Sequence, residues 1–191
     1  MPRDTSRLDM SIDFQPVNIA VLTISDTRTP DDDRSGDLLA ERITEDGHVL
    51  ASRMIVTDDV DRITARLQGW IKDPQIDVIV TTGGTGLTGR DSTPEAFDRT
   101  VEKAIPGFGE LFRQLSYEKI GTSTIQSRAV AGVAGGTYLF ALPGSPSGCR
   151  DGWDDILRYQ LDIRHRPCNF VEIMPRLTES ASRRRTSPVD A

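Results

Sequence analysis

The chain has 191 residues, 37% of them hydrophobic and 27% charged, which fits one α/β domain with tails better than two domains. Its net charge of −6 and aromatic share of 6% argue against general polyanion binding and against a stacking surface for single-stranded nucleic acid. No apolar run reaches the roughly 20 residues of a membrane span, and the first 16 residues lack the apolar core of a signal peptide. Cys149 and Cys168 form no CxxC pair. We therefore expect a cytoplasmic protein.

Strand and helix patterns alternate between two polar ends. We expect a flexible arm over 1–13, one domain over 14–176, and a polar tail over 177–191 whose basic triplet, Arg183–Arg185, is most simply a solvated surface. Within the domain the patterns predict, in chain order, a strand at 17–25, a helix at 35–45, a strand at 49–56, a helix at 59–71, a strand at 76–82, a helix from Ser92 or Thr93, a helix at 106–119, a strand at 133–142 and a helix at 151–159. This alternation predicts a mostly parallel sheet with helices on both faces, and ligands beyond the carboxyl ends of its strands.

The most informative segment is TTGGTGLTGRDSTPEA, residues 81–96, which follows a predicted buried strand. Four glycines lie within seven residues, and the pair Arg90–Asp91 separates them from a helix start, where either Thr93 caps Pro94 or Ser92 and Glu95 form a capping box. Glycines let a ligand approach bare backbone, and successive amides form a cradle for an anion such as phosphate. The segment therefore predicts a site for a phosphorylated small molecule.

Other interpretations of the glycines are weaker. The GxGxxG pattern at 84–89 follows the third strand, and RDSTP separates it from the next helix, whereas a nicotinamide or flavin site places it after the first strand and directly before a helix. The Walker pattern is missing because no Gly-Lys-Ser/Thr follows. A tight turn without a ligand is a remaining alternative, although it needs only one or two glycines.

Carboxylates follow two of the predicted strands. Asp91 lies beside the glycine loop, where the helix dipole alone would stabilise it by about 0.3–1 kcal/mol. Asp58 and Asp59 follow the strand at 49–56, where helix capping is the simpler explanation for either acid taken alone. Together with a phosphate cradle, such acids suit Mg²⁺, which takes one or two carboxylates, waters and phosphate oxygens.

Two more loops follow predicted strands. The first contains Ser25, Asp26 and Arg28, then the acidic triplet 31–33, which is more simply a solvated loop or helix cap than a metal site. Arginines and hydroxyls there suit oxyanions. The loop at 142–148 combines glycines and hydroxyls before a helix, and either contributes to a ligand site or forms a plain turn.

Six segments together resemble the MoaB/Mog family of molybdenum cofactor biosynthesis, which includes MogA and the G domain of gephyrin-type proteins: ISDTR (24–28), DRSG (33–36), VTDD (56–59), TTGGTGLTGRDSTPEA (81–96), PGFGELFRQLS (106–116) and LPGSPSG (142–148). Two further segments are similar to the MoaB branch in particular: GTSTIQSRAVAGV (121–133) and QLDIRHRPCNF (160–170). The resemblance covers about residues 14–170. One departure is Thr57, where the family often has proline before the acidic motif.

The resemblance implies a three-layer α/β/α fold of the molybdopterin-binding type, assembled as a homotrimer or as a hexamer made of two trimers. Active family members are molybdopterin adenylyltransferases, which join AMP from Mg-ATP to the terminal phosphate of the pterin and release pyrophosphate. The two carboxylates that the family needs for this step correspond to Asp58 and Asp91, which we expect to be catalytic and to hold Mg²⁺. Some MoaB-branch members lack one or both acids, so their presence here favours activity.

The expected binding residues follow from the same motifs. For phosphate, molybdopterin or nucleotide they are Ser25, Asp26, Arg28, Ser35, Gly36, Gly83, Gly84, Thr85, Gly86, Arg90, Pro143, Gly144 and Ser145. The alternative function is a non-catalytic molybdopterin-binding or carrier protein of the same pathway. A third is an assembly domain whose basic tail contacts a partner, with other molybdenum cofactor enzymes as candidates. We expect neither a nucleic acid nor a membrane as partner.

Overall fold

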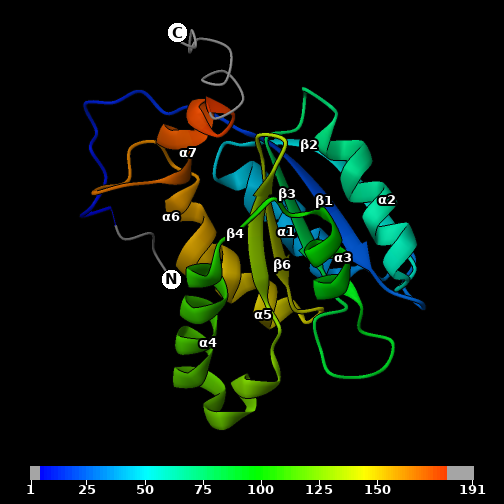
Figure 1. Ribbon diagram of the computed structural model, residues 1–191. Helices are drawn as coiled ribbons and strands as arrows, with labels where there is room; N and C mark the ends of the chain where they lie inside the picture. Colours follow the sequence, from blue (N-terminus) through cyan, green and yellow to red (C-terminus); the bar gives the residue numbers. More distant parts are fainter. Residues whose placement is uncertain (1–4, 180–191) are drawn as a thin grey trace, which may run out of the picture.

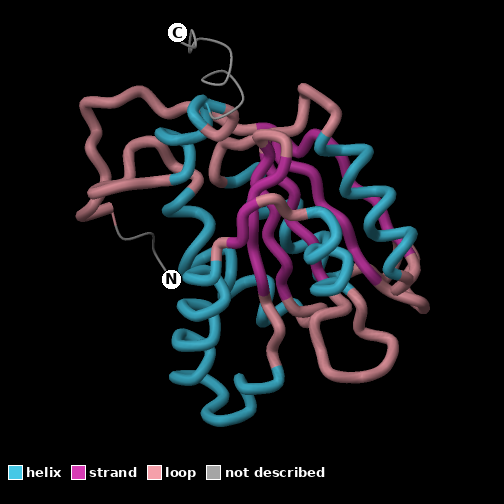
Figure 2. The backbone as a smooth tube through the Cα atoms, in the orientation of Figure 1, coloured by secondary structure: helices cyan, strands magenta, loops and turns pink. Residues whose placement is uncertain are grey.

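The apolar, β-branched segments of the sequence form the middle of a mostly parallel sheet (Figures 1 and 2). The computed structural model describes residues 5–179, and within that range six strands lie in the order β2-β1-β3-β6-β5-β4. The strands are β1 (Asn18–Ile24), β2 (Val49–Val56), β3 (Val78–Thr82), β4 (Lys103–Ala104), β5 (Val130–Ala134) and β6 (Thr137–Leu142). The four strands from β2 to β6 are parallel. At one edge β5 runs antiparallel to β6, and β4 runs antiparallel to β5.

Helices cover both faces of the sheet. One face carries α1 (Arg34–Glu45), α4 (Pro106–Ile120), α7 (Phe170–Ile173) and the continuous helical stretch formed by α5 (Pro146–Gly152), the π-helical turn Trp153–Leu157 and α6 (Arg158–Gln160). The other face carries α2 (Val60–Ile71) and α3 (Thr93–Thr100). The 3₁₀ helices are η1 (Gly121–Gln126) and η3 (Met174–Arg176). The predicted three-layer α/β/α architecture is confirmed.

Strand β1 shows why the sheet needs helices on both sides. Its Ile19 and Val21 belong to the core cluster with α1 and α4, whereas Ala20 and Leu22 belong to the cluster with α2 and α3. Side chains alternate between faces along a strand, so a strand that is apolar at every position must be buried on both.

The predicted strand at 133–142 is wrong, because two strands occupy this region. Gly135 (φ +59°) and Gly136 (φ +92°) form a two-residue turn that sends β6 back antiparallel to β5. Paired positive φ angles are those of tight hairpin turns, which favour Gly-Gly. The short edge strand β4 was not predicted either, since two residues carry no periodic signal.

The two ends of the chain differ in how much of them is described. Of the expected N-terminal arm, residues 5–13 lie against the segment after α6: Leu8 forms a bridge with His165, and the amide of Asp9 donates to the carbonyl of Arg164 at 2.8 Å. The basic triplet Arg183–Arg185 lies outside the described residues. Within 5–179, no helix is both long and apolar enough to cross a membrane.

Candidate functional site

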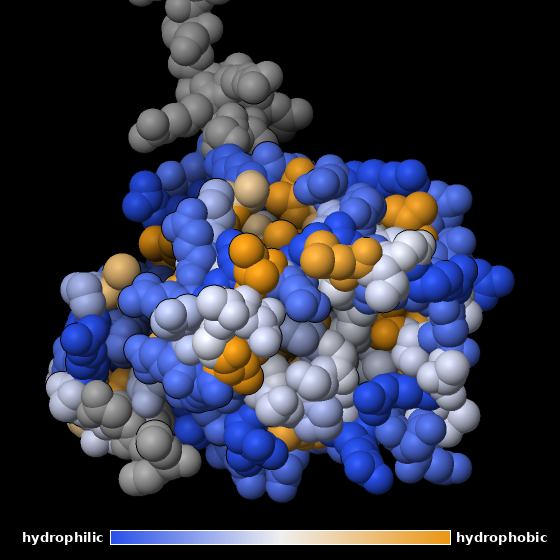
Figure 3. Space-filling view, turned by 90° about the horizontal axis from the view of Figure 1, so that it is seen from below, coloured by the Kyte–Doolittle hydropathy of each residue, from blue (hydrophilic) through white to orange (hydrophobic). Residues whose placement is uncertain are grey.

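The loops that follow β1, β2, β3 and β6 converge at the carboxyl end of the parallel strands, as predicted. They line one cleft of about 810 Å³. Figure 3 views the molecule from this end, where apolar side chains appear as separate groups among hydrophilic ones. The predicted site residues that line the cleft are Ser25, Asp26, Arg28, Asp58, Gly83, Gly84, Thr85, Gly86, Asp91, Pro143, Gly144 and Ser145.

The glycine loop lies against both predicted carboxylates. Gly84 has φ +63°, and a Cβ atom built there would lie 2.7 Å from Oδ2 of Asp58. A Cβ atom on Gly86 would lie 2.7 Å from Oδ2 of Asp91. Real Cβ atoms essentially never come this close, so a side chain at Gly86 displaces Asp91, and one at Gly84 displaces Asp58 and also Thr93, whose Oγ1 would lie closer still. The glycines therefore give the acids room beside bare backbone.

Asp58 is held by the start of α3. Its Oδ1 accepts from the amide of Ser92 at 3.0 Å and from the Ser92 hydroxyl at 2.6 Å. The predicted capping box is wrong for this reason: Ser92 is the N-cap residue, but its hydroxyl serves Asp58 and makes no cap hydrogen bond. The neighbouring Asp59 has another role, because its Oδ1 caps α2 by accepting from the amide of Arg62 at 2.9 Å.

Asp91 is held within its own loop. Its Oδ2 accepts from the amide of Thr88 at 2.8 Å and from the Thr88 hydroxyl at 2.7 Å. Burial raises the pKa of Asp91, but hydrogen bonds from Thr88 and Gly86 and the charge of Arg128 outweigh it, so the pKa lies below its usual range. Asp91 is therefore ionised at neutral pH and able to hold a cation.

Arg90 links the loop after β3 to the loop after β1 and does not line the cleft. Its Nε and Nη2 donate to Oδ2 of Asp26 at 2.9 and 2.7 Å, and Oδ1 of Asp26 accepts from the amide of Asp58 at 3.1 Å. The hydrogen bond from Arg90 holds the pKa of Asp26 below its usual range. Arg90, one of the two predicted binding arginines, is thus paired with a carboxylate that lines the cleft, whereas the other, Arg28, lines the cleft itself.

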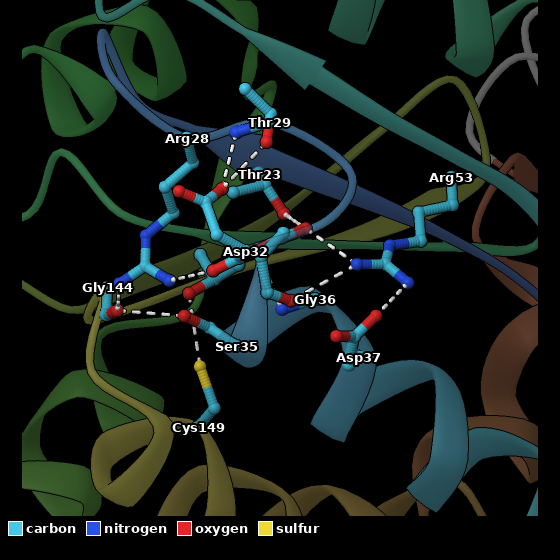
Figure 4. A network of polar contacts seen from close by, with 12 residues as sticks. Thr23, Arg28, Thr29, Asp32, Ser35, Gly36, Asp37, Arg53, Gly144 and Cys149 are labelled. Atoms are coloured by element: carbon cyan, nitrogen blue, oxygen red, sulfur yellow. Dashed lines mark hydrogen bonds and ion pairs between the residues drawn. The ribbon is translucent and has the colours of Figure 1, made fainter.

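Ser35 and Gly36 also lie outside the cleft and support its wall (Figure 4). The Ser35 hydroxyl donates to the carbonyl of Gly144 at 2.8 Å. Gly36 packs against Asp33, the N-cap residue of α1, which is fully buried and accepts from Thr23 Oγ1 at 2.7 Å and from Arg53 Nη2 at 2.8 Å. Ser35 and Gly36 therefore determine the geometry of the loop. The Ser35 hydroxyl is engaged in a hydrogen bond within the protein, and the space beside Gly36 is occupied by Asp33.

A second wall of the cleft was not predicted. It comes from α4, η1 and α5, and Figure 1 shows α4 extending past the end of the sheet. Its lining residues are Phe112, Ser116, Lys119, Ile120, Ser123, Thr124, Gln126, Ser127 and Asp151, and they are joined by Ser147 and Gly148 of the loop 142–148, which the sequence had offered as a candidate. The ammonium of Lys119 links α4 to α5 through Asp151 at 2.7 Å and to the π-helical turn through Asp155 at 2.9 Å. The only signal was the resemblance of 106–116 and 121–133 to family segments, since no glycine or acid pattern marks them.

Comparison with known proteins identifies the family to which these features belong. Residues 20–163 match the family model described as "Probable molybdopterin binding domain". The chain belongs to this family. It is 48% identical over 161 residues to molybdenum cofactor biosynthesis protein B of Escherichia coli K12, covering 84% of this chain and 95% of that protein.

Solved structures agree with the assignment to the molybdopterin-binding family. A crystal structure of molybdenum cofactor biosynthesis protein B superimposes with a TM-score of 0.78 at 38% identity, covering 86% of this chain and 98% of the other. The tungsten cofactor synthesizing protein MoaB from Pyrococcus furiosus gives a TM-score of 0.67 at 36% identity, covering 75% and 91%. The MoaB/MogA resemblance and the molybdopterin-binding fold predicted from the sequence are confirmed, and the protein acts in molybdenum cofactor biosynthesis.

Proposed function

We propose that this protein is a molybdopterin adenylyltransferase that binds molybdopterin and ATP in the cleft. The observation that carries the proposal is the convergence of Asp58, Asp91 and the glycine loop 83–86 on one cavity. Two acids beside a phosphate cradle suit nucleotidyl transfer, whereas pterin binding alone requires neither acid. The volume of about 810 Å³ lies in the upper range of ligand sites, as two substrates require.

The residues present fit a magnesium ion. The described residues 5–179 contain no group of three or more His, Cys, Asp and Glu side chains that could enclose a metal. Magnesium does not need such a cage, because it keeps waters and binds one or two carboxylates together with substrate phosphates. Asp58 and Asp91 would supply those carboxylates, and the ion would neutralise charge that develops on the triphosphate.

The protein's own contribution to the transfer is positioning. The amides of Gly84 and Thr85 would hold the triphosphate, since those of Gly83 and Gly86 donate to the carbonyl of Leu142 and to the Asp91 carboxylate. The terminal phosphate of the pterin would lie in line with the α-phosphorus. A bond forms between that phosphate oxygen and the α-phosphorus, the bond to the β-phosphate oxygen breaks, and pyrophosphate leaves. Phosphoryl-type transfer needs no nucleophilic side chain, which agrees with a cleft lined by hydroxyls, glycines and acids.

An adenylation assay tests the proposal. Purified protein with Mg-ATP and molybdopterin is expected to form adenylated pterin and pyrophosphate, and Asp91→Asn is expected to lower kcat by about 100- to 1000-fold, the usual cost of removing one group that stabilises charge. The matched control is Asp59→Asn. It removes the same charge next to Asp58, but Asp59 caps α2, and Asn still caps, so activity is expected to stay within about twofold.

The same assay separates the alternative function. A carrier protein would bind molybdopterin, form no adenylated product in the wild type, and bind pterin equally well in Asp91→Asn. That outcome would replace the adenylyltransferase proposal. We further propose that the protein is a homotrimer or a hexamer, supported by large exposed apolar side chains on α4 and η1, and that other molybdenum cofactor enzymes are its protein partners.

A further inference from the structure

We infer that Arg128 is a positioning residue that holds Gly86 and Asp91 from behind the glycine loop. Arg128 lies between η1 and β5 and does not line the cleft. Its Nε donates to the carbonyl of Gly86 at 2.6 Å, and its Nη2 donates to the carbonyl of Asp91 at 2.7 Å. One side chain thus donates hydrogen bonds to backbone carbonyls on both sides of the loop segment 87–90. Gly86 and Asp91 themselves line the cleft.

A guanidinium group suits this task better than any other side chain. Its N–H groups lie in one plane at fixed angles, so Nε and Nη2 can hold two carbonyls at once. The third contact, from Nη1, goes to the carboxylate of Glu95 on α3, which fixes the plane of the guanidinium. A lysine ammonium is a single point charge and cannot reproduce this fork.

The backbone of Arg128 is anchored separately from its side chain. Its amide donates to the carbonyl of Thr85 at 3.0 Å. Removing the side chain therefore leaves the strand leading into β5 attached to the loop and frees the carbonyls of Gly86 and Asp91. Because the amide of Gly86 donates to the Asp91 carboxylate, a shift of either peptide moves the acid.

This inference rests on the proposed function only for its catalytic readout, so the experiment uses two measurements. Hydrogen exchange of the amides in 84–92 reports loop order directly, and the adenylation assay reports kcat and KM for ATP. For Arg128→Ala we expect exchange in 84–92 to become at least about tenfold faster, while β1 and β3 exchange as in the wild type. The value of kcat is expected to fall by about 10- to 100-fold, as for other residues that orient a ligand-holding side chain.

Two comparisons separate positioning from loss of charge or stability. Arg99→Ala removes an equal charge from α3, where Arg99 pairs with Asp61 at the surface, and is expected to change neither measurement. Arg128→Lys is expected to restore part of kcat, and added guanidinium ion is expected to rescue Arg128→Ala but not Arg99→Ala. If Arg128→Ala does not fold, Glu95→Gln loosens the same guanidinium and is expected to speed loop exchange by a few-fold.

Wild-type loop exchange and wild-type kcat in Arg128→Ala would overturn the inference. So would faster exchange across the whole protein with no excess in 84–92, since that marks a general stability role. If the wild type itself forms no adenylated product, the proposed function fails, and loop exchange still decides the role of Arg128.

Discussion

At the scale of single residues, the site depends on which atoms the motif side chains can reach. Asp58 and Asp59 are adjacent in the chain, yet Asp58 meets Ser92 at the cleft while Asp59 caps α2. The glycines of the loop also differ in their surroundings. Gly86 leaves space that Asp91 fills, whereas a Cβ on Gly89 would meet nothing within 4 Å. The spacing of residues in a motif therefore does not show which of them contribute to the site.

This difference gives a prediction about two glycines of one loop. Gly86→Ala is expected to push the Asp91 carboxylate aside and lower kcat/KM for adenylation by about 10- to 100-fold, a loss of roughly 1.4–2.7 kcal/mol of transition-state stabilisation. Gly89→Ala, with open space around the new methyl group, is expected to stay within about twofold. Steady-state kinetics on the two variants checks this, and equal losses would show that the Gly86–Asp91 contact is not what matters.

At the scale of elements, buried polar contacts hold the strand-end loops around the cleft. Asp33 begins α1, and its buried carboxylate joins β1 through Thr23 and β2 through Arg53. Burial raises the pKa of Asp33, but hydrogen bonds from Arg53, Thr23 and the Gly36 amide outweigh it and bring the pKa below its usual value. The stabilisation therefore belongs to the ionised form.

The sign of this shift predicts how stability depends on pH. Asp33→Asn is expected to lower the free energy of unfolding by about 3 kcal/mol at pH 7, because it leaves Arg53 without its buried partner. The difference from wild type should be full above about pH 5 and should shrink as pH falls through about 3.9 and below, where the wild-type carboxylate takes up its proton. Urea unfolding at several pH values measures it.

Asp37→Asn is the control for the Asp33 prediction. Asp37 pairs with the same Arg53 at 2.6 Å, but its side chain is 59% exposed. Exposed ion pairs contribute about 0–1 kcal/mol, so a small loss is expected. A pH-independent difference for Asp33→Asn would contradict the role given to its charge.

At the scale of the whole molecule, several large apolar side chains are exposed near one end. Tyr117, Ile120 and Ile125 are exposed on α4 and η1, where α4 projects beyond the sheet (Figure 1). Exposed apolar side chains that come together mark protein interfaces, so these residues support the proposed assembly. Ile120 also lines the cleft, so association there would lie close to the site.

The proposed assembly predicts a solution mass of three or six times the 21.1 kDa chain by light scattering. Ile125→Glu, at a residue that is 80% exposed, is expected to shift the mass toward the monomer, because a charge replaces apolar contact. Ile173→Glu makes the same change on α7 at the opposite end of the molecule and is expected to leave the mass unchanged. A wild-type protein with the mass of a monomer would contradict the proposal of a trimer or hexamer.

Local sequence patterns were enough to predict the order of most elements, the layers, and the family. Burial on two faces of a strand or on one stripe of a helix imposes a period that is visible locally, and a cradle of glycines needs residues that are neighbours in the chain. Local pattern misjudged the hairpin at Gly135–Gly136, because an apolar run on both sides hides a turn.

Which polar groups line the cleft and which stabilise the fold depends on long-range contacts that the folded chain makes. Asp58 meets Ser92 across 34 positions, Arg128 reaches Asp91 across 37, and Ser35 reaches Gly144 across 109. Such contacts depend on how strands are ordered in the sheet, and that order leaves no periodic trace in the sequence. Ser35, Gly36 and Arg90 therefore matched the motifs yet lie outside the cleft, while the α4–η1 wall and Arg128 escaped prediction.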